Sequence, residues 1–181
     1  YRAELLRRLC DGFTQDAPGT DETHRPGEPP ADRARRLAFA KAKAVAARHT
    51  GALVIGSDQV AELDGQPLDK PGTAECAREQ LRRSSGRTVQ FHTALCLFDG
   101  RDGTHQVHTD STRAVFRPLS DSEIERYVAR EQPLDCAGSF KCEGLGISLF
   151  ERIENDDPTA LVGLPLIALA RLLRNAGYAI P

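Results

Sequence analysis

The sequence contains no methionine and no tryptophan, and it has no long run of apolar residues. A membrane-spanning helix needs about 20 mainly apolar residues, and no segment of this chain provides them. The chain also lacks the charged and then apolar opening of a signal peptide. The sequence therefore predicts a protein without a membrane partner.

The charges are balanced and dispersed along the chain. The 24 lysines and arginines stand against 26 aspartates and glutamates, which gives a formal net charge of -2. This composition produces neither the basic field that attracts nucleic acid nor an acidic tail. We therefore expect no nucleic-acid partner, and any other partner must be inferred from local groups of residues.

The five cysteines show no pairing pattern. Their odd number and the absence of a Cys-x-x-Cys pair favour free thiols in a reducing compartment, so the expected location is the cytoplasm. The sequence also has no G-x-x-x-x-G-K-[ST] and no G-x-G-x-x-G. It therefore supports neither P-loop nor Rossmann phosphate binding.

Helical and strand patterns alternate along the chain. Apolar periodicity and turn residues predict helices at 1–9, 31–49, 73–83, 120–130 and 163–177, and strands at 53–57, 88–98, 105–116 and 147–151. The strand at 105–116 is mostly polar, which predicts an edge or half-exposed position. A chain of this length is expected to form one domain that buries roughly two thirds of its unfolded surface. The pattern predicts a single α/β domain, residues 1–181, with a mixed β-sheet.

Asp58 is the first candidate for chemistry. The apolar segment that begins at Leu53 ends abruptly in Gly56-Ser-Asp-Gln59. An aspartate after a strand is often a turn cap. A carboxylate at the end of a buried strand can also act as a general base or bind Mg²⁺ or Mn²⁺. The local sequence favours neither interpretation over the other.

Lys41 is the second candidate, because it projects from the apolar stripe of the helix expected at 31–49. Such a lysine must extend to solvent, pair with a carboxylate or bind an anion. Pairing with Asp58 would be structural, whereas contact with a phosphate would be functional.

Three further charged residues have ordinary interpretations when each is taken alone. Lys70 precedes Pro71-Gly72 in a stiff turn, Glu22 lies in a polar loop, and Arg2 is at the start of a helix. Each is expected to be a solvated surface residue unless the fold brings it to Asp58 or Lys41.

Four motifs occur in an order that resembles a known family. They are Val54-Ile-Gly-Ser-Asp-Gln-Val60, Lys70-Pro-Gly72, Ala137-Gly-Ser-Phe-Lys-Cys-Glu-Gly144 and Val162-Gly-Leu-Pro-Leu166. Over nearly its whole length the chain resembles the Maf family of nucleoside triphosphate pyrophosphatases. Gly-Ser-Asp-Gln and Lys-Cys-Glu-Gly are similar to its 7-methyl-GTP pyrophosphatase branch, whereas the dTTP/UTP branch usually reads Gly-Ala-Asp-Thr and Ile-Gln-Gly.

The resemblance implies hydrolysis of a nucleoside triphosphate between its α and β phosphates. The products are a nucleoside monophosphate and pyrophosphate, and a divalent cation, Mg²⁺ or Mn²⁺, assists. Asp58 matches the family's catalytic aspartate, and Arg2, Lys41 and Lys70 match substrate-binding positions. Glu22 and Asp58 would hold the metal.

The resemblance also implies residues that select the base. Tyr1, Gln59 and Glu143 fall at the family's specificity positions. The Glu143 carboxylate can accept two hydrogen bonds from the edge of guanine, and an aromatic such as Tyr1 favours the cationic ring of 7-methylguanine. Family members are usually cytoplasmic homodimers with a central twisted mixed β-sheet, flanked by helices, in two lobes around a cleft. We therefore expect this architecture and a homodimer.

Family members normally begin with an apolar strand and a Ser-x-Ser-Pro turn, so we expect that sequence preceding Tyr1 is missing here. Three alternatives stay open: a pyrophosphatase specific for dTTP/UTP or inosine-type triphosphates, a nucleotide-binding regulator of cell division without turnover, and a structural α/β domain. The last alternative leaves Lys41 and the four ordered motifs unexplained.

Overall fold

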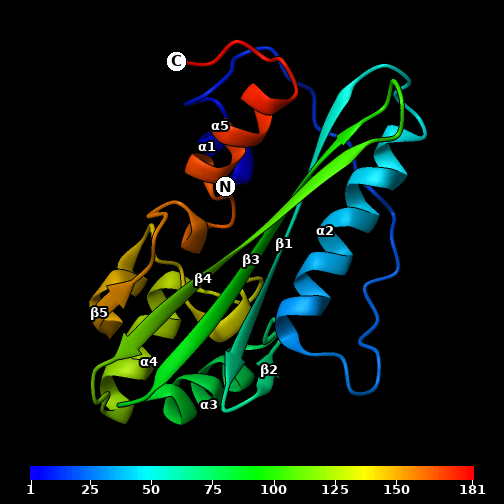
Figure 1. The fold of residues 1–181 in the computed structure, drawn as a ribbon. Coiled ribbons are helices and arrows are strands. Elements are labelled where there is room, and N and C mark those ends of the chain that lie inside the picture. Colours follow the sequence, from blue (N-terminus) through cyan, green and yellow to red (C-terminus); the bar gives the residue numbers. More distant parts are fainter.

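The structure, a computed structural model, describes residues 1–181. Its centre is a five-stranded sheet in the order β2-β1-β3-β4-β5 (Figure 1). Each strand pairs antiparallel with its neighbour in the sheet. The strands are β1 (Leu53–Leu63), β2 (Gln66–Leu68), β3 (Thr88–Asp99), β4 (His105–Phe116) and β5 (Phe150–Glu154).

Helices cover both faces of the long strands. Figure 1 shows α2 along one face, α1 and α5 against the other, and α3 and α4 together at the far end of the sheet. None of the helices is both long and apolar enough to cross a membrane. The α-helices are α1 (Arg2–Leu6), α2 (Pro30–Ala46), α3 (Ala74–Ser84), α4 (Asp121–Glu131) and α5 (Leu166–Asn175), and the 3₁₀ helices are η1 (Ala137–Ser139), η2 (Leu145–Leu149) and η3 (Ala160–Val162).

Three apolar clusters account for the division into two lobes. One lies between α2 and the sheet and is rich in alanine, and the second packs α1 and α5 on the opposite face through Leu95 and Leu97. The third and largest cluster joins α3, α4 and the distal strand ends around Phe91 and Phe116. The first two clusters form one lobe and the third forms the other, so the expected two-lobed α/β architecture is confirmed.

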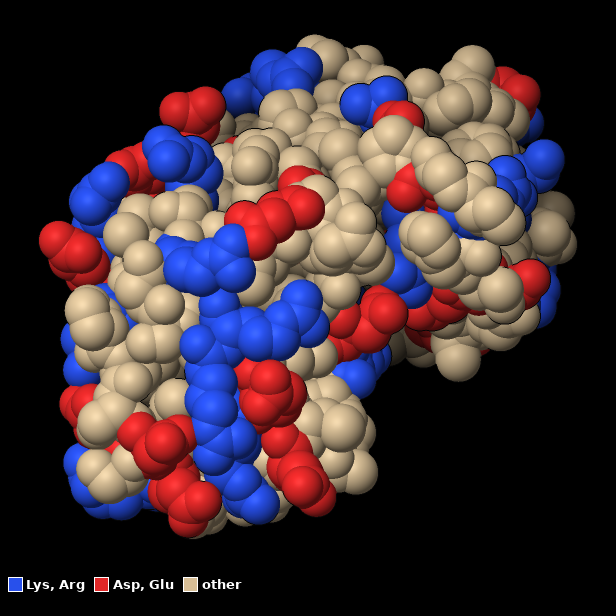
Figure 2. Space-filling model, turned by 90° about the horizontal axis from the view of Figure 1, so that it is seen from below, with Lys and Arg blue, Asp and Glu red and all other residues tan.

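The far end of the sheet carries dense but mixed surface charge. Arg82 of α3 pairs with Asp121 of α4 at 2.6 Å, and Arg78 lies 3.8 Å from Glu125. Seen from below, this end shows arginines and carboxylates side by side (Figure 2). The charges on this face therefore largely compensate one another.

The expectation of a mixed sheet was wrong, because all pairings are antiparallel. For the pairs β1–β2 and β3–β4 the physical reason lies in the connections. Asp64 and Gly65 both have positive φ in the short turn from β1 to β2, and β3 returns as β4 through a turn closed by the Asp99 amide donating to Thr104 O at 2.8 Å. Connections this short can join only antiparallel neighbours.

The predicted end of the first strand was also wrong. β1 continues through Asp58 to Leu63, because β3 pairs with it along Leu53 to Glu62. Ladder pairing with β3 outweighs the low strand propensity of glycine and aspartate. Asp58 is therefore a residue in the middle of a strand rather than a cap after one.

One other boundary differs from expectation. Residues 147–149 belong to η2, and β5 begins only at Phe150. β4 is paired with β5 only from Arg113 onward, so its first part is an edge and the prediction of a half-exposed strand is confirmed. The predicted caps are present, since Thr73 accepts from the Cys76 amide and Ser120 forms a capping box with Glu123.

Gly56 allows α2 to lie very close to β1. A Cβ at this position would contact Ala38 O and would lie 2.6 Å from Ala42 N, both of them backbone atoms of α2. A backbone atom in a packed helix cannot move aside as the end of a flexible side chain can. The absence of a side chain at residue 56 therefore sets the distance between the helix and the strand.

We expect Gly56→Ala to destabilise the fold, because the added methyl group pushes α2 away from β1. Overpacking of this kind costs about 1–3 kcal/mol, and urea denaturation monitored by circular dichroism measures it. Gly12→Ala is the control, since a Cβ there meets no atom within 4 Å. Equal unfolding midpoints for the two variants would contradict the proposed close contact.

Candidate active site

A cleft of about 1490 Å³ runs along β1 between the lobes. β2 pairs with β1 only at its end, from Ala61 to Leu63, so the backbone before Ala61 has β3 on one side only. All eight residues singled out in the sequence line this cleft: Tyr1, Arg2, Glu22, Lys41, Asp58, Gln59, Lys70 and Glu143. The fold thus brings together groups from six separate segments of the chain.

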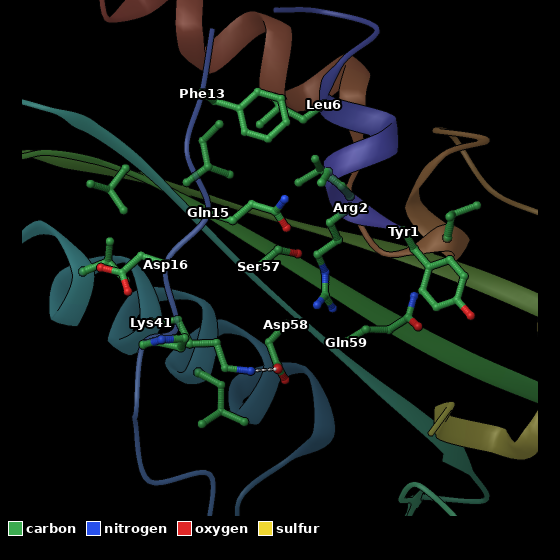
Figure 3. Close-up of a pocket in the computed structure, with 18 of the residues that line it drawn as sticks. Tyr1, Arg2, Leu6, Phe13, Gln15, Asp16, Lys41, Ser57, Asp58 and Gln59 are labelled. Atoms are coloured by element: carbon green, nitrogen blue, oxygen red, sulfur yellow. Dashed lines mark hydrogen bonds and ion pairs between the residues drawn. The ribbon is translucent and has the colours of Figure 1, made fainter. Parts of the chain in front are cut away.

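An ammonium group between two carboxylates is at the centre of the site. Lys41 Nζ lies 2.7 Å from Asp58 Oδ1 and 2.7 Å from Glu22 Oε1. The Lys41 and Asp58 side chains are only 16% and 11% exposed, whereas that of Glu22 is 52% exposed. Figure 3 shows Lys41 reaching from α2 to Asp58 on β1. The lysine in the apolar stripe is therefore paired with the candidate base.

Burial and charge act in opposite directions on Asp58. Burial raises the pKa of its carboxyl group above the ordinary value, and this effect exceeds the lowering by the Lys41 hydrogen bond and by the charges of Lys41 and Arg2. The pKa of Glu22 is lowered, chiefly because Lys41 hydrogen-bonds to it. The two carboxylates that share one ammonium group thus have pKa values displaced in opposite directions.

Arg2 approaches Asp58 from α1. Its Nε donates to Gly163 O at 2.8 Å, and Figure 3 shows the end of its guanidinium directed toward Asp58. The Nη atoms make no hydrogen bond within the protein. Lys70 is an exposed residue at the edge of the same cleft, and its charge contributes to lowering the pKa of Glu22.

The three predicted specificity residues lie on the side of the cleft toward η3 and the lobe that contains α3 and α4. The Gln59 side chain donates through Nε2 to Thr93 Oγ1 at 2.9 Å and to the carbonyls of Ala160 and Leu161, each at 3.1 Å. This fixes the amide orientation, so that its oxygen is left to accept a hydrogen bond. Tyr1 is 56% exposed and lies near Gln59 in Figure 3, and Glu143 is an exposed residue of the cleft wall.

The sequence also matches the model of a known protein family. The model described as Maf-like protein matches residues 1–176. The chain belongs to the Maf family. Three curated Maf relatives carry the name 7-methyl-GTP pyrophosphatase. That of Xanthomonas campestris pv. campestris is 60% identical over all of this chain and 94% of its own length. Those of Cupriavidus metallidurans and Ralstonia nicotianae are 58% identical over 98% of this chain and 89% and 92% of their own lengths.

Two residues of this Maf site were missed by the sequence reasoning. Arg33 lines the cleft from the same face of α2 as Lys41. Its Nη1 lies 3.0 Å from Asp69 Oδ1, and its buried Nε has no hydrogen-bond partner. Its spacing of four and four residues through Leu37 to Lys41 is a signal that identifies the shared face. Ser57 is buried and donates toward Gly163 O at 2.8 Å, a contact that no local pattern predicts.

The carboxylates of the Maf site are suited to a divalent cation. Asp58 Oδ2 and Glu22 Oε2 make no hydrogen bond with the protein, and both carboxylates converge on Lys41 through their other oxygens. Mg²⁺ is usually held by one or two carboxylates together with substrate phosphates rather than by a cage of protein ligands. No group of three or more His, Cys, Asp or Glu residues that could hold a metal occurs. The donor set therefore fits a cation that is bound with a phosphate substrate.

We expect Lys41→Met to raise the pKa of Asp58 further, because the hydrogen bond and the charge that lower it are removed while burial remains. A pH titration of the Asp58 carboxyl carbon by nuclear magnetic resonance measures the change. Lys43→Met is the matched control, since Lys43 is exposed on the same helix. An unchanged Asp58 titration in Lys41→Met would rule out this coupling.

Proposed function

We propose that this protein is a nucleoside triphosphate pyrophosphatase that hydrolyses 7-methyl-GTP to 7-methyl-GMP and pyrophosphate. The observation that carries the proposal is the convergence of Asp58, Lys41 and Glu22 with Arg2 in one cleft. Cations from several segments suit a polyphosphate, and a buried carboxylate with a raised pKa suits a base. Membership of the Maf family and the printed names of its relatives support the same activity.

The cationic side chains would bind and orient the triphosphate. Arg2 offers both of its Nη atoms, and guanidinium is well matched to the geometry of phosphate oxygens. Lys41 and Lys70 would neutralise charge on the same group from other sides of the cleft, and Arg33 adds a cation near Glu22. Preorganised positive charge of this kind stabilises the charge that develops on the transferred phosphorus.

Asp58 would act on the attacking water. The Oδ1 atom is held by Lys41 at 2.7 Å, which leaves Oδ2 to accept a proton. As the water oxygen bonds to the α-phosphorus, the bond to the bridging oxygen of the β-phosphate breaks and pyrophosphate leaves with the electron pair. The water proton passes to Asp58, whose raised pKa makes it a better base near neutral pH than an exposed aspartate.

The divalent cation is part of the proposal. Mg²⁺ or Mn²⁺ would be held by Glu22 directly and by Asp58 through a water, so that Asp58 Oδ2 stays free to accept the proton; carboxylate oxygens are the hard ligands these ions prefer. When bound, the ion supplies further neutralisation of the phosphate charge. Lys41 orients Asp58 through its own hydrogen bond, whether or not the ion is bound.

The base side of the cleft offers hydrogen-bond acceptors. The Glu143 carboxylate and the oxygen of Gln59 would accept from the adjacent N1–H and N2–H₂ donors of guanine. Inosine lacks the 2-amino group, and pyrimidines do not have this pair of adjacent donors. The positive charge of a 7-methylated ring would be favoured by Glu143 and by the exposed aromatic face of Tyr1.

Three further expectations from the sequence, on the domain, the location and the assembly, belong to this proposal. We propose that residues 1–181 form one catalytic domain, that it acts in the cytoplasm, and that it assembles as a homodimer. The free state of all five thiols agrees with a reducing compartment.

Asp58→Asn is expected to lower kcat for 7-methyl-GTP by about 10²- to 10⁴-fold, the usual contribution of a general base. Pyrophosphate release with Mg²⁺ or Mn²⁺ measures it, against GTP, ITP, dTTP and UTP as alternative substrates. In the parent protein, kcat should fall as the pH is lowered through the raised pKa of Asp58, because the protonated carboxyl group cannot accept a proton. An Asp58→Asn variant as active as the parent excludes this role.

Glu143→Gln is expected to lower the preference for 7-methyl-GTP over GTP by about tenfold while turnover persists. The guanine edge is the same in both substrates, so the loss of one acceptor weakens both alike. The preference falls because the neutral amide provides no charge for the methylated ring. The ratio of kcat/KM values for the two substrates is the measurement. Glu151→Gln, an exposed acid on β5, is the control. An unchanged ratio in Glu143→Gln would show that another residue selects the base.

A further inference from the structure

The segment from Ala160 to Gly163 has no role in the proposed chemistry, yet it contacts both ends of the site. We call it the carbonyl turn. Its carbonyl oxygens accept hydrogen bonds from side chains of α1, β1 and β3, at 2.8 Å from Arg2 Nε, 2.8 Å from Ser57 Oγ, 3.0 Å from Thr93 Oγ1, and 3.1 Å twice from Gln59 Nε2. One short stretch of backbone thus holds a proposed phosphate ligand and a proposed base-selecting residue.

These contacts determine which atoms remain available to a substrate. Arg2 uses Nε on Gly163 O, so its two Nη atoms are left for phosphate. Gln59 uses Nε2 on the carbonyls of Ala160 and Leu161, so its oxygen is left for the base. Figure 3 shows the side chains of Arg2 and Gln59 among those that line the cleft. A movement of the carbonyl turn would therefore misplace both groups together.

Gly163 is adapted to this position. Its φ of 119° is one that side-chain-bearing residues rarely adopt, and a Cβ would lie 3.2 Å from Arg2 Nε. The turn accordingly depends on a conformation that glycine adopts readily and that other residues rarely adopt.

A buried carboxylate holds the residues that flank the carbonyl turn. Asp157, 3% exposed, accepts from Thr159 N at 2.9 Å and Thr159 Oγ1 at 2.6 Å through Oδ1, and from Ile167 N at 2.7 Å through Oδ2. Thr159 Oγ1 also accepts from Leu166 N at 2.8 Å. Hydrogen bonds to an ionised acceptor are stronger than those between neutral groups. Asp157 therefore fastens the residues on both sides of the carbonyl turn.

We propose that Asp157 is a positioning residue for the pyrophosphatase site. Through the carbonyl turn it orients the Arg2 guanidinium for phosphate and the Gln59 amide for the base, without touching the substrate itself. This proposal rests on the proposed function. The competing explanation is that Asp157 only supports the start of α5, in which case its loss affects stability alone.

Asp157→Asn tests the proposal, because an amide group cannot accept all three hydrogen bonds with its nitrogen in place of one oxygen. We expect KM for 7-methyl-GTP to rise about tenfold and the preference over ITP to fall by a similar factor. We expect kcat to fall as well, because Arg2 also stabilises the charge that develops on phosphorus, but by much less than in Asp58→Asn, since the Lys41–Asp58 pair is untouched. The affinity for the product 7-methyl-GMP, measured by calorimetry, should fall in parallel with the rise in KM.

Ser120→Ala is the matched control for loss of a helix cap. Ser120 caps α4, which lies in the other lobe, so its variant should lower the melting temperature without changing KM or the base preference. If Asp157→Asn behaves like Ser120→Ala, with unchanged KM, preference and 7-methyl-GMP affinity, Asp157 is merely structural and the proposal is overturned.

Thr159 provides a second pair of variants if Asp157→Asn does not fold. Thr159→Ser retains the hydroxyl group and should keep the parental KM, whereas Thr159→Val should reproduce the tenfold rise. Equal KM values for these two variants overturn the positioning role.

A parent protein that binds 7-methyl-GMP but releases no pyrophosphate overturns the proposed function alone. The calorimetric affinities of the Asp157 and Thr159 variants then still decide whether the carbonyl turn positions Arg2 and Gln59. A parent that neither binds nor hydrolyses any nucleotide overturns both proposals.

Discussion

The site depends on one ion pair between a helix and a strand. Lys41 on α2 can reach Asp58 on β1 only because the alanine face of α2 and Gly56 let the two elements lie close together. The pair keeps a largely buried carboxylate oriented, and burial still raises its pKa. Breaking a buried pair is costly because one charge is left uncompensated. The packing of the lobe and the geometry of the cleft are thus linked through this contact.

Much of the helical part of the fold could be predicted from local sequence. The stripe on α2, with Lys41 within it, and the capping box at Ser120 are signals contained in a few neighbouring residues. The extent of β1 could not be predicted, because Gly56, Ser57 and Asp58 have low strand propensity and are held in the strand by pairing with β3. Local preference gives way where a ladder supplies the missing stabilisation.

In the candidate site, too, some features could be predicted from local sequence and others could not. The residues that carry charge, such as Lys41 and Asp58, could be chosen from sequence, because a lysine in an apolar stripe needs a partner. The backbone acceptors could not, since Arg2 and Gly163 are separated by 161 positions, and a carbonyl oxygen leaves no mark in the sequence. Arg33 was missed although its position on the face of Lys41 was available.

The alternation of side chains along β1 has a consequence for how this chain can vary. Gly56 and Asp58 face α2, whereas Ser57 and Gln59 face Gly163 and η3. A strand that shifts by one residue turns every side chain to the opposite face. One inserted or deleted residue between Leu53 and Asp58 would therefore direct the acid toward backbone carbonyls and an uncharged side chain toward Lys41. The length of β1 before Asp58 is therefore fixed.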